Sequence, residues 1–240
     1  MLQRIGSVVF WTFVVVTSLL LFPVALVIFL MTYPFDPQRR ALHQFTCFWA
    51  SLYTWFSPLW RVHVENRDRI DPHTTYVMVA NHLSLLDILV LFRLFTHFAW
   101  VSKVENFKVP VIGWNMRLNG YIPLVRGDPE SAGQMMAQCR AALGRGTSIM
   151  MFPEGTRSRD GRVQRFRPGA FQLAIETSTT ILPILITGTG DALPKRGFVL
   201  QGKHRIGITV LDPIPPSAFA SDDPRQLAQQ VQAVILAAAP

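Results

Sequence analysis

A long stretch near the start of the chain contains no charged residue, and it limits what this sequence can fold into. It extends from Ile5 to Tyr33 and consists mostly of Val, Leu, Phe, Ile and Trp. About 20 apolar residues in a helix are enough to cross the ~30 Å hydrocarbon core of a bilayer. A signal peptide has an apolar region of only about 7–15 residues and a small-residue cleavage site. Here Thr-Tyr-Pro-Phe-Asp follows the stretch, so we expect a retained membrane anchor.

The sequence leaves open how this anchor enters the membrane. Pro23 lies inside the apolar stretch, where it predicts either a kink or the turn of a re-entrant hairpin. Arg4 precedes the stretch, and Arg39 and Arg40 follow it. This difference in positive charge is too small to orient the segment by itself. A full span and a monotopic insertion therefore both remain open.

The composition favours an anionic partner. The chain has 240 residues, enough for one α/β domain plus a short appendage, and its formal net charge is +8. Strong basicity indicates nucleic acid, an anionic membrane surface or an anionic substrate. Next to an apolar anchor, and without a nucleic-acid-binding motif, lipids and phosphorylated substrates are the better interpretation, and no nucleic-acid partner is expected. Cys47 and Cys139 are too few for a disulfide framework or a metal site.

The segment that follows the anchor has the periodicity of an amphipathic helix. Between residues 41 and 60, apolar side chains recur at spacings of three and four: Leu42, Phe45, Trp49, Leu52 and Phe56. Trp49, Trp55 and Trp60 are of the type that settles at a lipid–water boundary, which favours contact with the membrane surface. The alternative is a helix packed on the protein core. We expect residues 1–60 to form the membrane anchor and this interfacial helix.

Beyond residue 60, predicted strands and helices alternate. Strands are predicted at Arg61–Glu65, Thr75–Ala80, Phe98–Ser102, Tyr121–Val125, Thr147–Phe152, Ile181–Thr187 and Arg205–Leu211. Helices are predicted at Leu85–Leu94, from Asp128 to Leu143, at Gly169–Thr177 and from Asp222 onward. This alternation indicates an α/β domain over residues 61–240, with a central, mostly parallel sheet and helices on both faces.

The segment Asn81-His82-Leu83-Ser84-Leu85-Leu86-Asp87 directly follows a predicted strand. On one continuous helix, His82 and Asp87 would lie about 140° apart and could not meet. They can meet if Ser84 and Asp87 form an S-x-x-D helix start, which leaves His82 in the preceding turn. The carboxylate would then fix the imidazole tautomer, and His82 could take a proton from a hydroxyl. The alternative is a histidine and an aspartate that only cap local structure.

Two further strand ends carry candidate phosphate ligands. Phe152-Pro153-Glu154-Gly155-Thr156-Arg157-Ser158 combines a carboxylate, a hydroxyl, a guanidinium and free backbone N–H groups. The planar fork of Arg157 suits a phosphate, and we expect Glu154 to orient Arg157 or to bind a hydroxyl. The alternative is a solvated loop, since more arginines follow. Another predicted strand ends at Arg126. Strand ends of a parallel sheet share one edge, so we expect a base and two phosphate-binding cations in one pocket.

Four segments of the chain resemble the conserved blocks of the glycerolipid acyltransferases. Asn81 to Asp87 resembles the H-x4-D block, and Phe152–Ser158 matches the F-P-E-G-T-R-S block without a mismatch. Gly120 to Arg126 resembles the block that ends in an arginine, and Leu182-Pro183-Ile184 resembles the short apolar block. The resemblance covers residues 62–211 and is greatest to the 1-acyl-glycerol-3-phosphate acyltransferases.

This resemblance implies a reaction and a set of site residues. His82, supported by Asp87, would deprotonate the 2-hydroxyl of 1-acyl-glycerol-3-phosphate, which attacks an acyl thioester and yields phosphatidic acid. The acceptor phosphate would be held by Arg126, Glu154, Gly155, Thr156 and Arg157. Supporting positions would be Asn81, Ser84, Gly120 and Lys103.

The resemblance also implies partners and a location. The donor would be acyl-CoA or acyl carrier protein, with Lys103 and the basic loop 157–167 as candidate contacts, and no metal or other cofactor is needed. The active site would face the cytoplasm at a membrane, in a bacterium the inner membrane. Two alternatives remain: the same chemistry on another lysophospholipid or lyso-aminolipid, and a non-catalytic membrane lipid-binding protein. The sequence does not indicate acyl chain length or oligomeric state.

Overall fold

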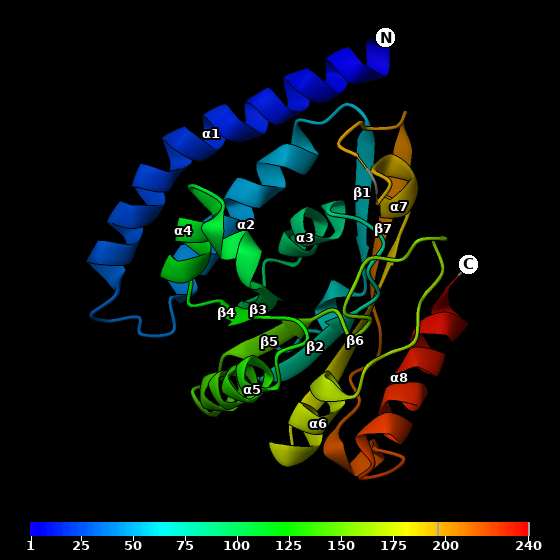
Figure 1. Cartoon of the computed structure of the whole chain (residues 1–240). Coiled ribbons are helices and arrows are strands. Elements are labelled where there is room, and N and C mark those ends of the chain that lie inside the picture. The colour runs from blue at the N-terminus through cyan, green and yellow to red at the C-terminus, as the bar shows by residue number, and fades with distance from the viewer. Residues whose placement is uncertain (196, 240) are drawn as a thin grey trace.

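One seven-stranded sheet forms the centre of the computed structural model, which describes residues 1–195 and 197–239 (Figure 1). Across the sheet the strands lie in the order β1 (Trp60–Glu65), β7 (His204–Val210), β6 (Thr180–Thr187), β2 (Tyr76–Ala80), β5 (Ser148–Met151), β3 (Phe98–Lys103) and β4 (Ile122–Leu124). Neighbouring strands are parallel except β6 and β7, which are antiparallel. The predicted mostly parallel sheet is therefore confirmed.

Helices cover both faces of this sheet, as the sequence predicted (Figure 1). They are α1 (Leu2–Thr32), α2 (Arg40–Trp55), α3 (Leu86–Leu91), α4 (Ile112–Leu118), α5 (Pro129–Gly144), α6 (Gly169–Glu176), α7 (Thr189–Ala192) and α8 (Pro224–Ala238). Short 3-10 helices lie at Arg67–Arg69, Phe92–Leu94, Val104–Lys108 and Pro216–Ala218. Helices α5, α6 and α8 gather on one face, while α2 and α3 lie on the other with α1 outside α2. The segment that forms α4 was not predicted as a helix.

Two of the long helices begin as their sequences predict. The Asp128 side chain accepts a hydrogen bond from the Glu130 N–H at 3.0 Å at the start of α5. Asp223 does the same for the Arg225 N–H at 2.9 Å at the start of α8. In both helices a proline occupies the first turn, where its missing N–H leaves no partner unsatisfied. These caps fix where the two helices enter their face of the sheet.

The core lies between the sheet and its helices. All five residues of β2 are buried, as the unbroken apolar run Tyr-Val-Met-Val-Ala predicts for a central parallel strand. Helix α8 supplies Leu227, Val231 and Ile235, each fully buried. Burying one such side chain contributes about 1.5–3 kcal/mol. The carboxyl ends of β2, β3, β4, β5 and β6 lie along one edge of this rigid support.

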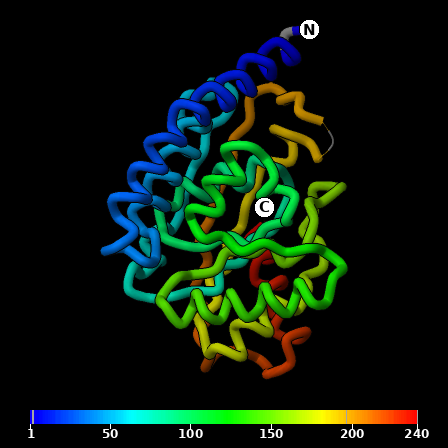
Figure 2. Tube along the Cα trace, turned by 60° about the vertical axis from the view of Figure 1, so that its left-hand side comes forward, coloured from blue at the N-terminus to red at the C-terminus, as the bar shows by residue number. Residues whose placement is uncertain are grey.

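Helix α1 is continuous, long and apolar enough to cross a membrane by length and composition. It runs through Pro23 without a break, so the predicted alternative of a re-entrant hairpin is wrong. Its inner side packs along α2 (Figures 1 and 2), where Thr17 donates a hydrogen bond to the Tyr53 hydroxyl at 3.1 Å. Its outer side exposes a row of apolar residues that includes Ile5, Val9, Val16, Leu20, Val27 and Met31.

The tryptophans after the anchor do not all lie at a lipid boundary. Trp49 is 3% exposed and Trp60 is 4% exposed, so the prediction of membrane contact is wrong for both. The reason is that α2 lies between α1 and the rest of the domain, which turns Trp49 inward, while Trp60 begins β1. The apolar side chains that α2 and its end do expose are Phe48, Trp55 and Phe56.

Candidate active site

His82 and Asp87 are in direct contact just beyond the carboxyl end of β2. His82 Nδ1 lies 2.7 Å from Asp87 Oδ2. Asp87 is fully buried, and the His82 side chain is 12% exposed. Because a carboxylate only accepts hydrogen bonds, this contact assigns the proton to Nδ1 and leaves Nε2 as the acceptor. None of the residues that the structure describes hydrogen-bonds to Nε2, so it is available to take a proton from a substrate.

The helix start predicted between these two residues explains their contact, with one difference. Asp87 Oδ2 also accepts the backbone N–H groups of Leu83 at 2.6 Å and Ser84 at 2.8 Å, which is the half of a capping box in which the acid folds back. The Ser84 hydroxyl, however, donates to the Leu193 carbonyl at 2.7 Å and accepts the Leu86 N–H at 3.2 Å. Helix α3 begins at Leu86, and Ser84 ties the turn to the segment after β6.

Thr189 completes the environment of the aspartate. Its hydroxyl donates to Asp87 Oδ1, so both carboxylate oxygens are held by donors. Thr189 is fully buried and follows Gly188, whose φ of 78° turns the chain at the end of β6. A Cβ at Gly188 would lie 2.1 Å from the Arg205 carbonyl oxygen, so only glycine fits this turn. Four donors thus hold the Asp87 side chain in one orientation toward His82.

The imidazole ring of His82 is also held by an aromatic contact. It stacks on Phe152 with ring centroids 3.9 Å apart and an interplanar angle of 8°. Trp100 supports Phe152 from a centroid distance of 5.4 Å. Phe152 is the first residue after β5, so two neighbouring strand ends fix the plane of the candidate base.

The second motif closes onto the backbone of His82. The His82 N–H donates to Glu154 Oε1 at 2.9 Å, and the Ser158 N–H donates to the His82 carbonyl at 2.7 Å. Glu154 is 4% exposed, and its Oε2 has no hydrogen-bond partner among the described residues. Burial raises the pKa of Glu154 to about 7. We expected Glu154 to orient Arg157 or to bind a hydroxyl; the structure instead places Oε1 on the backbone of the base.

Three arginines gather on the same edge of the sheet. Burial lowers the pKa of Arg126, and the neighbouring charges of Arg167 and Arg157 lower it further, while Glu105 acts in the opposite sense. Arg126 lies two residues beyond β4. Arg157 and Arg167 belong to the loop after β5. Like charges held together repel, so this cluster favours an anion that neutralises them. The two predicted phosphate ligands, Arg126 and Arg157, are therefore brought together.

Gly155 allows Arg167 to approach this loop. Its φ is 72°, and a Cβ there would lie 2.8 Å from Arg167 Nε. The Arg167 N–H donates to the Pro153 carbonyl at 2.8 Å, which holds the two ends of the loop together. Lys195 Nζ donates to the Thr156 hydroxyl at 3.3 Å and to the Arg157 carbonyl. The loop thus presents Thr156 and Arg157 in a fixed arrangement.

Besides Ser84, the three other supporting positions separate into two groups. Asn81 is buried and joins β2 to β6, since its side chain donates to the Ile186 carbonyl at 2.9 Å and accepts the Ile186 N–H at 2.7 Å. Lys103 ends β3 at the same edge, in an ion pair with Glu105 at 3.1 Å. Gly120 lies before the start of β4, at the opposite edge, where its φ of 70° leaves room for Arg39. Gly120 therefore shapes the end of α4 and does not line the site.

The sequence did not single out three residues of the site. Thr189 follows a predicted strand and a glycine, so the rule used for His82 could have found it. Arg167 was included only as part of the basic loop 157–167, which was expected to contact the donor or to be solvated, and only the proximity of Gly155 and Arg126 distinguishes it from its neighbours. Phe152 was taken as part of a strand and a motif, and no sequence signal indicates that its ring would stack on His82.

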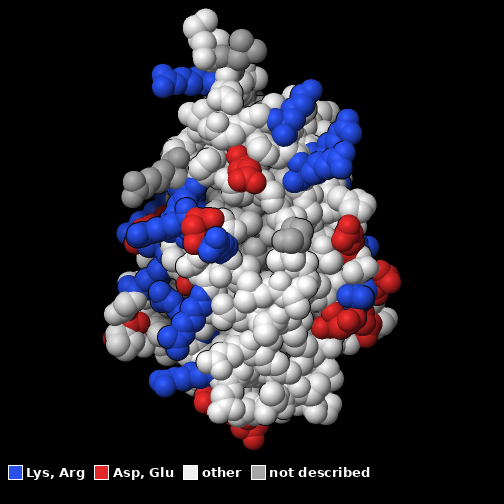
Figure 3. Space-filling model, turned by 90° about the vertical axis from the view of Figure 1, so that its right-hand side faces the viewer, with Lys and Arg blue, Asp and Glu red and all other residues white. Residues whose placement is uncertain are grey.

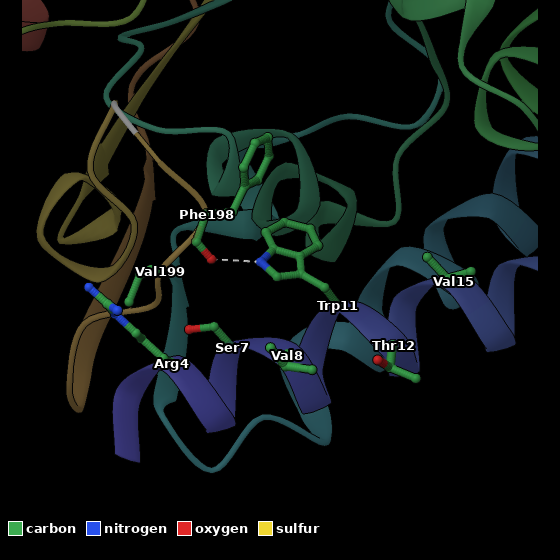
Figure 4. A pocket seen from close by; sticks show the side chains of 8 residues that line it. All are labelled: Arg4, Ser7, Val8, Trp11, Thr12, Val15, Phe198 and Val199. Carbon is green, nitrogen blue, oxygen red and sulfur yellow. Dashed lines mark hydrogen bonds between the residues drawn. The ribbon is translucent and has the colours of Figure 1, made fainter. Parts of the chain in front are cut away.

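A separate groove of about 580 Å³ lies between α1 and the segment around Phe198 (Figure 4). Val8, Trp11 and Val15 line it, Arg4 lies at one end, and Trp11 Nε1 donates to the Phe198 carbonyl at 2.7 Å. Its lining is almost entirely apolar and contains no residue of the His82 cluster. The groove is therefore distinct from the candidate active site and belongs to the apolar surface that α1 presents.

Comparisons with known proteins identify the family of the chain. A family model described as Acyltransferase matches residues 61–187, which includes His82, Asp87 and the loop after β5. The chain belongs to the acyltransferase family. A chloroplast 1-acyl-sn-glycerol-3-phosphate acyltransferase of Arabidopsis thaliana is 39% identical over 176 residues, 72% of this chain and 49% of the relative. One from Chlamydomonas reinhardtii is 35% identical over 222 residues, 92% of this chain and 66% of the relative.

The fold also has a solved counterpart. The crystal structure of the 1-acyl-sn-glycerophosphate acyltransferase PlsC from Thermotoga maritima covers 98% of this chain and 94% of its own, with a TM-score of 0.79 and 22% identity. At this identity the likeness establishes the shared fold, including the N-terminal helices. The chain spans about half to two thirds of the length of the plant and algal relatives.

Proposed function

We propose that this acyltransferase transfers a fatty acyl group from a thioester donor to the 2-hydroxyl of 1-acyl-glycerol-3-phosphate, giving phosphatidic acid. The observation that carries the proposal is the contact of 2.7 Å between His82 Nδ1 and Asp87 Oδ2, which leaves Nε2 free as a base beside a cluster of arginines. The names of the relatives support lysophosphatidate as the acceptor.

In the proposed reaction His82 acts first as a base. Nε2 takes the proton of the acceptor hydroxyl while its oxygen attacks the thioester carbonyl carbon. The imidazolium that forms is stabilised by Asp87, whose two oxygens accept four donors. When the tetrahedral intermediate collapses, the carbon–sulfur bond breaks and the thiolate leaves. The imidazolium returns the proton to the sulfur, so the products are an ester and a free thiol.

The arginine cluster would position the acceptor. Its phosphate is attached to the carbon next to the one that carries the reacting hydroxyl, so it must bind close to His82. Arg126 and Arg157 can each donate paired hydrogen bonds to a phosphate, and Thr156 and the N–H groups of the loop add further donors. Holding the acceptor in one orientation converts an encounter of three molecules into a local reaction and supplies much of the acceleration.

Helix α1 would place this site at a membrane surface. Its outer face is apolar along its length, and its inner face is bound to α2. We propose that the exposed faces of α1 and of the end of α2 enter the lipid together, with the active site on the cytoplasmic side where thioester donors occur. A lysolipid could then reach His82 without leaving the bilayer surface. In a bacterium the corresponding membrane is the inner membrane.

A competition assay tests the proposal. The full chain in detergent is offered a mixture of lysophosphatidate, other lysophospholipids and a phosphate-free lysolipid, with acyl-CoA and acyl carrier protein donors, and products are identified by mass. We expect phosphatidate to dominate. Acylation of the phosphate-free lysolipid in preference would favour the second acceptor class, and lysolipid binding without turnover on any donor would favour a non-catalytic lipid-binding protein.

An arginine variant tests the acceptor site within the same assay. Arg126→Ala should raise the KM for lysophosphatidate about tenfold, because an interaction with a charged group is lost. Arg145→Ala is the matched control, since Arg145 is exposed and lies before β5, at the opposite edge of the sheet. Equal acceptor KM values in the two variants would contradict the proposed role of Arg126 in binding the acceptor.

A further inference from the structure

A second polar hollow lies between the loop after β5 and helix α8. This cleft has a volume of about 490 Å³, within the range of small-ligand sites in proteins. Glu154 and Thr156 line the end nearest the candidate base. The remaining lining includes Arg165 and Arg167 from the loop and Arg225, Gln229 and Gln232 from α8. The Gln232 side chain donates to the Gln164 carbonyl at 3.1 Å, which ties the two walls together.

The cleft has the chemistry of a site for a phosphorylated ligand. Its three arginines come from two separate elements and face one hollow, and its amides are further donors. Glu154 is the one acidic residue among the described lining residues, and it is buried with Oε2 lacking a partner. Since burial raises its pKa to about 7, Glu154 is in part a neutral acid near neutral pH and offsets the arginine charges only in part. Figure 3, viewed from the side of α8, shows Lys and Arg along its left margin and at its upper right, with Asp and Glu beside some of them.

The cleft is joined to the reaction through Glu154. Its Oε1 accepts the backbone N–H of His82, so the near end of the cleft lies directly behind the turn that carries the base. The opposite wall is formed by Arg225, Gln229 and Gln232 on α8. A ligand that fills the cleft therefore lies between α8 and the loop that holds the backbone of the base.

These observations point to the donor. Building on the proposed function, we propose that the cleft between the loop 154–168 and α8 binds the phosphate-bearing nucleotide end of an acyl-CoA donor. The acceptor phosphate must lie close to its own reacting hydroxyl, and its proposed ligands Arg126 and Arg157 do not line the cleft. The phosphates of acyl-CoA are separated from the thioester by the long pantetheine arm, which matches a second cationic site apart from those two arginines. A folded carrier protein would need an open surface, whereas this site is a small cleft.

The first test measures binding without turnover. The full chain in detergent is titrated calorimetrically with CoA, which has no acyl group to transfer. Arg225→Ala and Arg165→Ala should each raise the Kd for CoA about tenfold, because each removes a cation that would contact a phosphate. Arg61→Ala is the matched control: Arg61 is exposed on β1 and its loss lowers the net charge equally. Equal Kd values for Arg225→Ala and Arg61→Ala would overturn the proposal.

The second test separates donor from acceptor. With acyl-CoA and lysophosphatidate, Arg225→Ala should raise the donor KM about tenfold while the acceptor KM and kcat stay within about twofold of the unaltered chain. A rise in the acceptor KM instead would assign the cleft to the acceptor. Turnover with acyl carrier protein, combined with no CoA binding, would assign the donor to a protein partner. Either result overturns the proposal.

These tests also distinguish this proposal from the proposed function. If CoA binds in a manner that depends on Arg225 but no phosphatidate forms from any donor, the proposed reaction is contradicted and the assignment of the cleft to CoA is supported. If phosphatidate forms from acyl-CoA with the same donor KM in Arg225→Ala and Arg61→Ala, the proposed reaction is supported and the assignment of the cleft to CoA is contradicted. Inorganic phosphate serves as a competitor: displacement of CoA by millimolar phosphate, absent in Arg225→Ala, would support phosphate recognition.

Discussion

The backbone N–H of His82 donates a hydrogen bond to Glu154 Oε1 at 2.9 Å, although the two residues are 72 positions apart. This bond connects the turn after β2 to the loop after β5. The same loop makes a second hydrogen bond to His82, because the Ser158 N–H donates to the His82 carbonyl at 2.7 Å. The position of the base thus depends on a buried acid as well as on Asp87.

Glu154 should make stability depend on pH. Its pKa rises from 4.5 to about 7 in the folded chain because the carboxyl is buried. The folded state therefore binds this proton more tightly than the unfolded state does. Its contribution is complete below pH 4.5 and is lost as the pH rises to about 7. Between these values, the unfolding free energy of the unaltered chain should fall relative to that of Glu154→Gln, as measured by urea unfolding in detergent. Parallel profiles would contradict the burial argument.

Gly155→Ala should damage the loop more than the same change at Gly161. Both glycines have positive φ, 72° and 76°, so each substitution costs about 1–2 kcal/mol of backbone strain. Only at Gly155 would the new Cβ collide with Arg167, whereas Gly161 has open space. We expect similar backbone penalties but a raised KM for lysophosphatidate in Gly155→Ala alone, because the collision also displaces Thr156 and Arg157 of the same loop. Equal kinetics in the two variants would mean that the collision with Arg167 leaves the acceptor site unchanged.

Asn81→Ala should destabilise the sheet near the site. The Asn81 side chain satisfies both the N–H and the carbonyl of Ile186, and all three groups are buried. Its removal leaves two buried backbone groups without partners, at about 1–3 kcal/mol each. Asn106→Ala is the control, because Asn106 bonds the Ser102 hydroxyl at a half-buried position. Chemical denaturation should show a clearly larger loss for Asn81→Ala, and similar losses would argue against the cross-strand role.

A charge on the outer face of α1 should weaken membrane binding. Leu20 is 68% exposed on α1 and Leu236 is 47% exposed on α8. If α1 lies in lipid, Leu20→Lys places a charge in an apolar medium, at a cost of a few kcal/mol. The fraction of protein that sediments with vesicles should fall for Leu20→Lys and stay unchanged for Leu236→Lys. An equal effect of both changes would argue that α1 is not the membrane-contacting surface.

Most of the architecture could be predicted from the sequence because periodicity reports local burial. Residues 76–80 form an unbroken apolar run, and they form the fully buried β2. The Asp-Pro pairs at 128–129 and 223–224 mark helix starts, and both aspartates cap helices. The prediction was weaker where the sequence does not report which face of a helix another element covers. Trp49 has the side chain of an interfacial residue but packs inward, because α1 covers α2 from outside.

Within the site, the sequence predicted pairs that lie in one motif better than contacts between motifs. The contact of His82 with Asp87 follows from a local helix start, so the six residues from 82 to 87 contain the information. The stacking of His82 on Phe152 and the bond from Thr189 to Asp87 depend on which strands are neighbours, which periodicity does not report. Gly120 shows the converse error, since a residue inside a motif lies at the far edge of the sheet.

Turnover by His82→Ala is the measurement that tests the central proposal most directly. The unaltered chain, His82→Ala and Asp87→Asn are each purified in detergent, shown to be folded by their thermal transitions, and given a thioester donor and lysophosphatidate. We predict that phosphatidate, identified by mass, forms with the unaltered chain and that kcat falls by about 10³ or more in His82→Ala, with a large loss also in Asp87→Asn. Near-normal phosphatidate formation by a well-folded His82→Ala would contradict the role of His82 as the base.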